Sequence, residues 1–443
     1  MINNKKANYK LMQDAYEGAG GFEDGAYLEQ HPRESVEKYA KRKKLAYYLN
    51  YLKPCVDAHV DPIFKREAVR DYEGSGAKAW ELFLKDVDFA NTGIKQFMKR
   101  AALLAKLQGV CFIIMDREKD ATSNNVLELE TNRSKMPYIF CVSPRRVNEI
   151  KVDKFGRIVY FEYEEPSDDE TKANAKRVLT PQGWKRVDDK NTEEGTWDFG
   201  GAVPIVPLYS VEHDPFNPLP TSDFLSITKT NCNIFNECSW LNDILLNQTF
   251  SILVYPSTEE DDLTIGTSNA LGFPADASHF PQFIAPSSDP ATILRDNIKV
   301  LQEECYRMAG VVNVTGVRVA TSGTAKAWDF EQTNQILASF ADQIEQAEKR
   351  IADLFAKFCG VELEYSVAYP SDFSIADIAT ELANAEIAKG LGFGDDFNVE
   401  VYKRVLSAYL PEISDKNFDD LVDNYKLKLE NETRDQNIEL SNE

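Results

Sequence analysis

The segment Gly310–Phe358, GVVNVTGVRVATSGTAKAWDFEQTNQILASFADQIEQAEKRIADLFAKF, decides how the rest of the chain is organised. Its first part, up to Gly323, is rich in β-branched residues, Ser and Thr and has no stable period, which predicts an irregular loop. From Thr324 onward no Gly or Pro interrupts the segment, and apolar residues recur at steps of three and four, as on one face of a very long helix. The residues of this apolar stripe are Phe330, Leu337, Phe340, Ile344, Ala347, Ile351, Leu354 and Phe358. A flexible loop that leads into such a helix is uncommon inside a compact enzyme; on this stretch alone, a long core helix behind an ordinary connector is an equal alternative.

The composition excludes several classes of protein. With 443 residues, of which 43% are hydrophobic, the chain is long enough for two or three packed regions and cannot be disordered throughout. The formal net charge of −22 argues against wrapping nucleic acid with a basic face, which requires clustered Lys and Arg. It leaves open a surface that DNA passes without binding tightly.

Cysteine usage and hydropathy indicate a reduced, intracellular setting. The cysteines are odd in number, scattered and without a CxxC pair: Cys55, Cys111, Cys141, Cys232, Cys238, Cys305 and Cys359. No N-terminal signal pattern is visible, and the longest purely apolar run, Val110 to Met115, is too short to span a bilayer. We therefore expect a soluble protein that is cytoplasmic when it is made.

The first half of the chain reads as an arm followed by an α/β region. Residues 1–33 are polar and Gly-rich, which predicts an extended arm, and a helical pattern runs from Glu34 to Phe64 with Pro54 and Pro62 as breaks. The basic run Lys41 to Lys44 is more consistent with a solvated helix face, or with pairing to acidic neighbours, than with a phosphate site. The remaining expectations for this region, 34–220, are helices at 80–87 and 92–107, a buried strand at 110–116, and strands at 138–142, 147–152, 158–164, 177–180 and 183–187.

The second half alternates helices with irregular segments. The predicted order is a helix at 221–250, a small β-type insertion at 251–290, a helix at 291–309, the loop at 310–323 and the long helix with a following strand at 324–370. Residues 371–443 are predicted to be helical, in three pieces broken near Gly390 and at Pro411. From Val361 to the end, 7 basic and 19 acidic residues make this part strongly acidic.

No catalytic signature stands out. The chain contains no GxxxxGK[ST], no GxGxxG after a strand, no HExxH and no GxSxG. Its four histidines, His31, His59, His213 and His279, lie far apart and away from any Cys at metal-ligand spacing. We therefore predict no catalytic residue, no metal and no cofactor. The alternative is a cytosolic enzyme of unrecognised class, with Cys/His or carboxylate chemistry between the β-rich and helical regions.

The order helix, insertion, helix, loop, long helix resembles that of the portal proteins of tailed bacteriophages, and locally a subgroup of short portals. Three passages carry the likeness: TSDFLSITKTNCNIFNECSWLNDILLNQTFSILV, the junction SGTAKAWDFEQTNQILASFADQIEQAEKRI and the N-terminal run YLEQHPRESVEKYAKRKKLAYYLNYLKPCVDAHVDPIFKRE. The matching positions are Arg42, Lys43, Ala46, Tyr48, Asn50, Val56, Ile63, Phe64, Ser322, Gly323, Ala325, Lys326, Asp329 and Glu331. The chain departs from the family in a short crown and in a single Arg in the loop.

The resemblance implies an α+β, portal-like fold. It has an α/β wing (34–220), two stem helices (221–250 and 291–309) around a small β clip (251–290), a tunnel loop (310–323), a long helix with a returning wing strand (324–370) and a helical crown with an acidic tail (371–443). It also implies a role for particular residues. Candidate DNA contacts in the loop are Asn313, Thr315, Arg318, Thr321 and Ser322; Arg295 and Lys299 would line the channel; and Tyr255, Glu259, Glu260, Asp261, Asp262, Phe280 and Phe283 would contact partners from the clip.

The function that the resemblance implies is that of a head–tail connector. Twelve or so copies would form a ring, a dodecamer, at one capsid vertex of the virion, after assembly in the host cytoplasm. Double-stranded DNA would pass through it non-specifically during packaging and genome ejection. The expected partners are the terminase large subunit, the head–tail adaptor or tail proteins, and the major capsid or scaffolding protein, with no membrane. Another virion structural protein, such as an adaptor or capsid component, is a weaker alternative.

Overall fold

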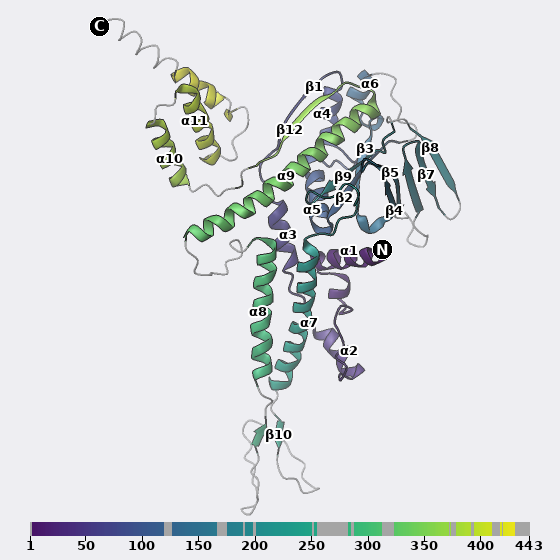
Figure 1. Ribbon diagram of the computed structural model, residues 1–443, viewed down its shortest axis with the longest axis vertical. Helices are drawn as coiled ribbons and strands as arrows, with labels where there is room; N and C mark the ends of the chain where they lie inside the picture. Colours follow the sequence, from purple (N-terminus) through teal and green to yellow (C-terminus); the bar gives the residue numbers. More distant parts are fainter. Residues whose placement is uncertain are drawn as a thin grey trace, which may run out of the picture. The chain divides into compact units, whose positions relative to one another are not determined.

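A computed structural model describes most of the chain, and it divides into two units, Met1–Ser371 and Asp372–Glu443 (Figure 1). Among the described residues, no helix combines the length and the apolar character needed to cross a membrane. The described residues are 2–118, 126–165, 175–188, 191–197, 201–249, 252–254, 282–284, 288–311, 323–371, 373, 378–390, 394–409, 417–418 and 420–429.

The N-terminal segment is helical, so the prediction of an extended arm over residues 1–33 is wrong. Helix α1, Ile2–Glu17, is followed by the short 3-10 helix Gly20–Phe22. Tyr9, Met12 and Ala15 are spaced by three and are fully buried in the same core as the buried side of α7. This narrow apolar strip anchors an otherwise polar helix inside unit 1, because its apolar side chains are removed from water while the polar faces of the helix stay hydrated.

The helical pattern between Glu34 and Phe64 forms two helices instead of one. Helix α2 is Val36–Leu45, with Ser35 accepting a hydrogen bond from the Lys38 amide as its N-cap, and α3 is Leu52–Val60. The chain is extended at Ala46, well before Pro54, which lies in the first turn of α3 where its missing N–H is tolerated. The break places Tyr48 and Tyr51 in the core around α7.

The helices predicted at 80–87 and 92–107 and the strands predicted at 110–116 and 138–142 are present, and a further strand, β9, which was not predicted, completes a three-stranded antiparallel sheet. Helix α5 ends at Gly109, whose φ of 92° favours glycine, and the fully buried strand β2 begins at the following residue. Strand β2 lies between β3 and β9 in this sheet. The elements of this region are α4 (Ala77–Lys85), α5 (Ile94–Gln108), β2 (Val110–Asp116), α6 (Val126–Thr131), the 3-10 turns Arg133–Lys135 and Pro144–Arg146, β3 (Tyr138–Val142) and β9 (Ile205–Tyr209).

A second sheet packs against the first. In the described part of the chain it is a five-stranded antiparallel meander, and Phe161 in its second strand lies 4.9 Å from Phe112 of β2, ring centre to ring centre. The fifth strand was not predicted, because its sequence TEEGT has no apolar alternation. The strands are β4 (Val147–Val152), β5 (Ile158–Glu165), β6 (Ala175–Thr180), β7 (Gly183–Val187) and β8 (Thr192–Thr196).

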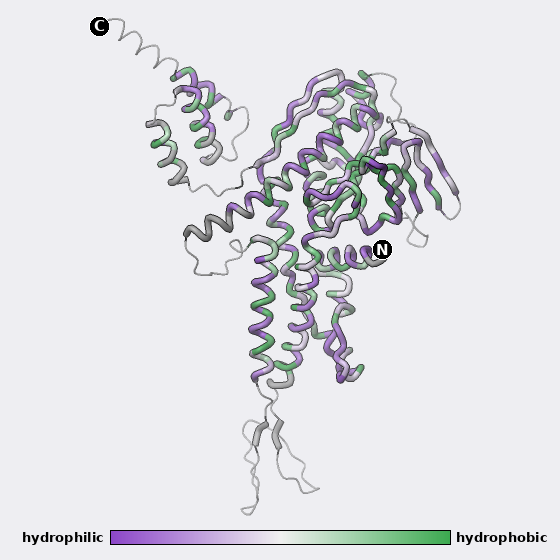
Figure 2. Tube along the Cα trace, in the orientation of Figure 1, coloured by the Kyte–Doolittle hydropathy of each residue, from purple (hydrophilic) through white to green (hydrophobic). Residues whose placement is uncertain are grey.

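A helical hairpin projects from this body (Figure 1). Its helices are α7, Phe224–Thr249, and α8, Asp289–Ala309, as the sequence predicted, and they pack against each other along their length. Between them, strands β10 (Ile252–Val254) and β11 (Gln282–Ile284) pair antiparallel. Figure 2 shows hydrophilic and hydrophobic residues alternating along both helices, as expected for helices that each expose one side.

The long helix is confirmed as α9, Gly323–Cys359, and it buries the predicted stripe at every position from Leu337 to Leu354. Strand β12, Glu364–Ala368, then pairs antiparallel with β1, Val69–Glu73, which the sequence did not predict. The carboxylate of Glu348 in α9 is fully buried beneath this pair. It accepts hydrogen bonds from Arg70 Nε at 2.7 Å and from the hydroxyls of Tyr365 and Tyr369, both at 2.5 Å. These contacts join β1 and the C-terminal strand of unit 1 to the long helix.

The second unit is a small helical bundle, as predicted for the chain after Ser371. It contains α10, Ile378–Gly390, α11, Asp395–Tyr409, and a further helical segment that includes residues 420–429. Tyr402 and Tyr425 stack with ring centres 4.1 Å apart, and the bundle has a core of its own, formed by Val399, Leu406, Val422 and Leu429.

Candidate channel-lining hairpin

The base of the hairpin is held in the core of unit 1 by aromatic packing. Phe235 on α7 is fully buried and contacts Phe22 and Tyr48 edge-on, with ring centres 5.3 and 5.9 Å apart. Full burial of such a side chain contributes about 2–3 kcal/mol. Helix α8 contributes Cys305 and Ala309 to the same core. Half of the hairpin is therefore a fixed part of unit 1, and its distal half extends away from that core.

A buried amide joins α7 to the start of α3. Asn231 is completely buried, and its Oδ1 accepts hydrogen bonds from the Tyr48 hydroxyl at 2.8 Å and from the backbone amides of Tyr51 and Leu52 at 3.0 and 3.2 Å. Its Nδ2 donates to the Leu49 carbonyl at 2.8 Å. The side chain of Tyr51 makes no capping hydrogen bond, so Asn231 satisfies two amides at this helix start from another helix, while the Lys53 amide donates to Asn50 Oδ1. In the sequence, Asn231 is a polar residue on the side of the helix that carries the apolar residues Ile227 and Ile234.

A buried ion pair fixes α2 against α7. Arg42 donates from Nε and Nη2 to the two carboxylate oxygens of Glu34, at 2.9 and 2.8 Å, and from Nη1 to Ser239 Oγ at 2.7 Å. Both charged side chains are almost inaccessible, at 3% and 8% exposure, and the hydrogen bonds from Arg42 lower the pKa of Glu34. One of the four residues of the basic run is thus structural: Arg42 pairs with an acidic neighbour, which is one of the two outcomes that the sequence predicted for this run.

The two helices of the hairpin are also linked at mid-length. Asn297 on α8 donates from Nδ2 to Glu237 Oε1 on α7 at 2.7 Å, and Asn233 donates to the same oxygen at 3.2 Å. The second oxygen, Oε2, is buried and accepts no hydrogen bond within the described part of the protein. The contact fixes the register of α8 on α7 where the apolar contacts thin out.

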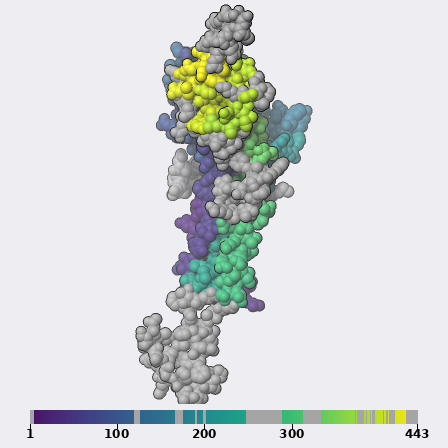
Figure 3. Space-filling model, turned by 90° about the vertical axis from the view of Figure 1, so that its left-hand side faces the viewer, coloured from purple at the N-terminus to yellow at the C-terminus, as the bar shows by residue number. Residues whose placement is uncertain are grey.

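The exposed side of α8 has two different flanks. Ile293 and Val300 are seven residues apart, two helical turns, and are 67% and 55% exposed on one flank. Arg295 and Lys299 are four apart and lie exposed on another flank, where Arg295 contacts only the adjacent Asp296, at 3.3 Å, among the described ion pairs. The side of the hairpin that α8 forms faces the viewer in Figure 3. An apolar flank and a basic flank on one helix provide two kinds of contact surface.

The loop between α8 and α9 is anchored at its start. His59 Nε2 donates to the Ala309 carbonyl at 2.6 Å, and Thr333 Oγ1 of α9 donates to the Gly310 carbonyl at 2.6 Å. Burial, and secondarily the charge of the nearby Lys106, lower the pKa of His59 to about 4, so this imidazole is neutral at pH 7. Burial likewise lowers the pKa of Lys106 to about 8. The last turn of α8 is therefore tied to α3 and α9 before the loop begins.

Most of the predicted contact residues fall outside the described residues. This holds for the loop residues Asn313, Thr315, Arg318, Thr321 and Ser322, and for Tyr255, Glu259, Glu260, Asp261, Asp262 and Phe280 of the insertion. Phe283 lies in β11, where its backbone is in register with Leu253 of β10. Arg295 and Lys299 are brought together on one flank of α8, as described above.

Metal-ligating groups do not gather in the described part of the chain, where His, Cys, Asp and Glu form no group of three or more that could hold a metal ion. A surface pocket of about 340 Å³ lies between α2 and α7, and one of about 560 Å³ lies on β6, β7 and β8. Neither pocket is located between the β-rich and helical regions, where the enzyme alternative would place its site.

Comparison with known proteins finds similarity only among solved structures. No protein-family model matches the chain, and no curated protein matches it. A chain of "Virion of native gene transfer agent (GTA) particle" is 12% identical with a TM-score of 0.45, over 81% of this chain and 89% of that one. A chain of "Neck of empty GTA particle computed with C6 symmetry" is 11% identical with a TM-score of 0.45 (79% and 88%), and one of "Neck of native GTA particle computed with C12 symmetry" is 10% identical with a TM-score of 0.44 (90% and 97%).

Proposed function

We propose that this protein is a portal-type subunit that forms a closed ring around a channel for double-stranded DNA. The observation that carries the proposal is the projecting α7–α8 hairpin with its two unlike exposed flanks. A ring of copies related by rotation needs one surface for the neighbouring copy and another for the channel. The apolar flank fits the first role and the basic flank the second.

The apolar flank is suited to contact between copies. Ile293 and Val300 on α8 are exposed, and Leu245 and Leu246 near the distal end of α7 are 49% and 40% exposed. Exposed apolar residues on a projecting element are available for contact with another chain. Covering these four side chains against a neighbour would remove their apolar area from water at about 25 cal/mol per Å².

The basic flank and the overall charge suit a conduit. A net charge of −22 per copy repels the duplex, and salt limits the range of that repulsion to about 8–10 Å. Sparse cations such as Arg295 and Lys299 then give weak phosphate contacts that carry no sequence information. In this proposal Arg318 adds to them from the tunnel loop, and DNA slides without being held.

The remaining surfaces receive the partners that a portal requires. The clip, 251–290, contacts the terminase large subunit during packaging and the head–tail adaptor afterwards, and 371–443 forms the crown. The wing contacts the major capsid or scaffolding protein at one vertex. The ring itself has no enzymatic role, and the terminase supplies the chemical energy for packaging.

Two matched double variants on α8 test the assignment. Ile293→Glu with Val300→Glu and Arg295→Gln with Lys299→Gln each lower the net charge by the same amount, on one helix and at exposed positions. We expect the first pair to abolish rings in negative-stain images and in light-scattering mass. The second pair should form normal rings but pass or retain DNA less well in a packaging assay. Normal rings from the first pair, or lost rings from the second, would contradict the assignment of the flanks.

Deletion of residues 313–320 tests the tunnel loop separately. The hydrogen bonds of His59 to Ala309 and of Thr333 to Gly310 lie outside the deleted segment, so the ends of α8 and α9 remain anchored. Rings should form as in the wild type while DNA packaging or retention falls. If the deletion prevented ring formation instead, the tunnel-loop assignment would be wrong.

A further inference from the structure

We infer that the basic face of α2, together with the pocket beside it, binds an acidic segment of a neighbouring copy, the run Glu259–Asp262. The inference rests on the proposed ring and adds a specific contact between its subunits. The basic face is defined here as Lys38, Lys41 and Lys44 of α2, and Arg33, which precedes the helix, lies in the pocket.

Such a contact requires first a local positive charge on an otherwise acidic protein, and the basic face provides it. Residues 33–44 contain six basic and two acidic residues, in a chain whose net charge is −22. Arg42 forms an ion pair with Glu34, and Lys38 lies 3.0 Å from Asp243 of the same copy. Lys41 and Lys44 are exposed, and neither forms an ion pair with any described carboxylate. Two cations therefore remain available for carboxylates of another copy.

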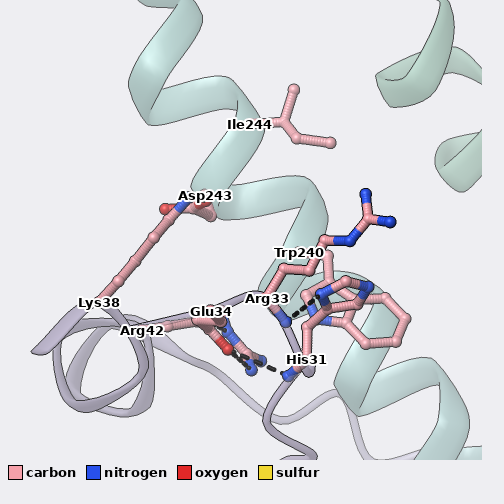
Figure 4. A pocket seen from close by; sticks show the side chains of 8 residues that line it. All are labelled: His31, Arg33, Glu34, Lys38, Arg42, Trp240, Asp243 and Ile244. Atoms are coloured by element: carbon pink, nitrogen blue, oxygen red, sulfur yellow. Dashed lines mark hydrogen bonds and ion pairs between the residues drawn. The ribbon is translucent and has the colours of Figure 1, made fainter. Parts of the chain in front are cut away.

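The pocket supplies an apolar surface next to these cations. Trp240 and Ile244 of α7 form one wall, and His31, Arg33 and Lys38 lie at its other side, around a volume of about 340 Å³ (Figure 4). A pocket of this kind takes one apolar side chain as a buried anchor, while the cations beside it pair with carboxylates adjacent to that side chain. The run EEDD is followed directly by Leu263, so the segment offers both features in the right order.

The position of α2 along the hairpin brings the face within reach. Asn242 Nδ2 donates to the Leu45 carbonyl at 3.1 Å, so α2 lies beside the last turns of α7. At 1.5 Å per residue, this contact is about 10 Å from the helix end at Thr249. Ten further residues lead to Glu259, and a chain of that length spans at most about 35 Å. Equivalent residues in a ring lie at the same height along the axis, so the segment of one copy has to cross only the spacing between neighbours to meet α2 of the next.

The charge of the whole protein makes such a contact useful. Copies that carry −22 each repel one another, and complementary patches at the interface select the correct orientation and speed the encounter. Pairing EEDD with the basic face joins the densest acidic run of the insertion to the densest basic run of the chain. The contact is ionic at its rim, so it weakens as salt rises.

Zero-length crosslinking of assembled rings tests the contact directly. Rings are assembled from an equal mixture of ¹⁵N-labelled and unlabelled protein and treated with a carbodiimide, which joins amines to adjacent carboxylates. We expect mass spectrometry to find Lys41 or Lys44 joined to 259–262 in peptides with one labelled and one unlabelled half. Rings that give no such mixed peptide overturn this inference and leave the proposed ring intact. If the wild-type protein forms no rings, the proposed function fails and this contact fails with it.

Charge reversal provides a second test that does not depend on crosslinking. Lys41→Glu with Lys44→Glu should raise the concentration needed for half-maximal assembly about tenfold, since each reversal replaces an attraction by a repulsion. Adding Glu259→Lys with Glu260→Lys should return it to near the wild-type value. The matched control is Lys78→Glu with Lys85→Glu on α4, whose side chains are 76% and 68% exposed. Circular dichroism verifies folding of every variant; failure of the combined variant to recover assembly, with the control normal, would refute the pairing.

Discussion

Replacing Asn231 by Leu removes the amide that caps α3 from α7 while keeping the side-chain size close to the original. The substitution leaves the amides of Tyr51 and Leu52 and the carbonyl of Leu49 without their partner in a buried site. Each such group costs about 1–3 kcal/mol when left unsatisfied, and part of that is recovered by burying apolar carbon. We therefore expect Asn231→Leu to lower the free energy of unfolding of unit 1 by about 3–4 kcal/mol.

The matched control is Asn242→Leu, the same change on the same helix. Asn242 makes one hydrogen bond at an exposed position, to the Leu45 carbonyl, so its loss should cost about 0.5–1 kcal/mol. Urea titration followed by tryptophan fluorescence measures both losses, with Trp240 of α7 as a reporter on the hairpin itself. Hydrogen exchange adds a local measurement, because the amides of Tyr51 and Leu52 should lose protection only in Asn231→Leu. If the two variants were equally stable, Asn231 would not be the joint between α7 and α3 that its hydrogen bonds indicate.

Three further predictions concern unit 1. Glu348→Ala should lower the free energy of unfolding in urea by about 3–5 kcal/mol, because it leaves Arg70 without its carboxylate partner. Adding Arg70→Met should recover part of this loss, and a further loss instead would show that the two residues are not coupled. The pKa of His59 is about 4 in the folded state and 6.5 in the unfolded state. The contribution of neutral His59 to the free energy of unfolding is therefore complete above pH 6.5, and about 3 kcal/mol of it is lost as the pH falls from 6.5 to 4. This part of the pH dependence should be absent in His59→Gln. Gly109→Ala should lower the free energy of unfolding by about 2–3 kcal/mol, because φ is 92° and a Cβ would lie 3.0 Å from the Pro220 carbonyl oxygen. The control Gly201→Ala, where φ is also positive but nothing lies near the Cβ, should cost about 1 kcal/mol. Equal losses in urea unfolding would contradict the steric contribution at Gly109.

Helices and strands with a clear hydrophobic pattern could be predicted from the sequence, with boundaries near those in the structure. The stripe from Leu337 to Leu354 and the uninterrupted run VCFIIMD each admit one packing, a long amphipathic helix and a buried strand, so local pattern and tertiary structure agree. Helix α1 was missed because its buried strip is only a few residues wide and a Gly-rich stretch follows it. Strand β8 was missed because its sequence is polar throughout.

The hydrogen bonds, ion pairs and strand pairings that connect the elements could not be predicted, since they join residues that lie far apart in the chain. Asn231 is visible as a polar residue on an apolar stripe, but nothing in the sequence says that its partners are Tyr51 and Leu52. Arg42 looks like any other member of a basic run until Glu34 and Ser239 are brought against it. The pairing of β1 with β12 has the same character, because each strand is short and neither sequence specifies its partner.

The β1–β12 pair also has a mechanical consequence. Unit 2 continues from Ser371, so tension on that connection enters unit 1 through Tyr369 and β12. A pull along the strand loads its hydrogen bonds to β1 together, from Ala368 opposite Val69 to Glu364 opposite Glu73, whereas a pull across the strand would open them one at a time. Behind the strand, the Tyr369 hydroxyl is fastened to Glu348 in the middle of α9. Load on the connection therefore passes into the longest helix of the protein, and forced detachment of β12 is governed by the rate at which this buried anchor opens.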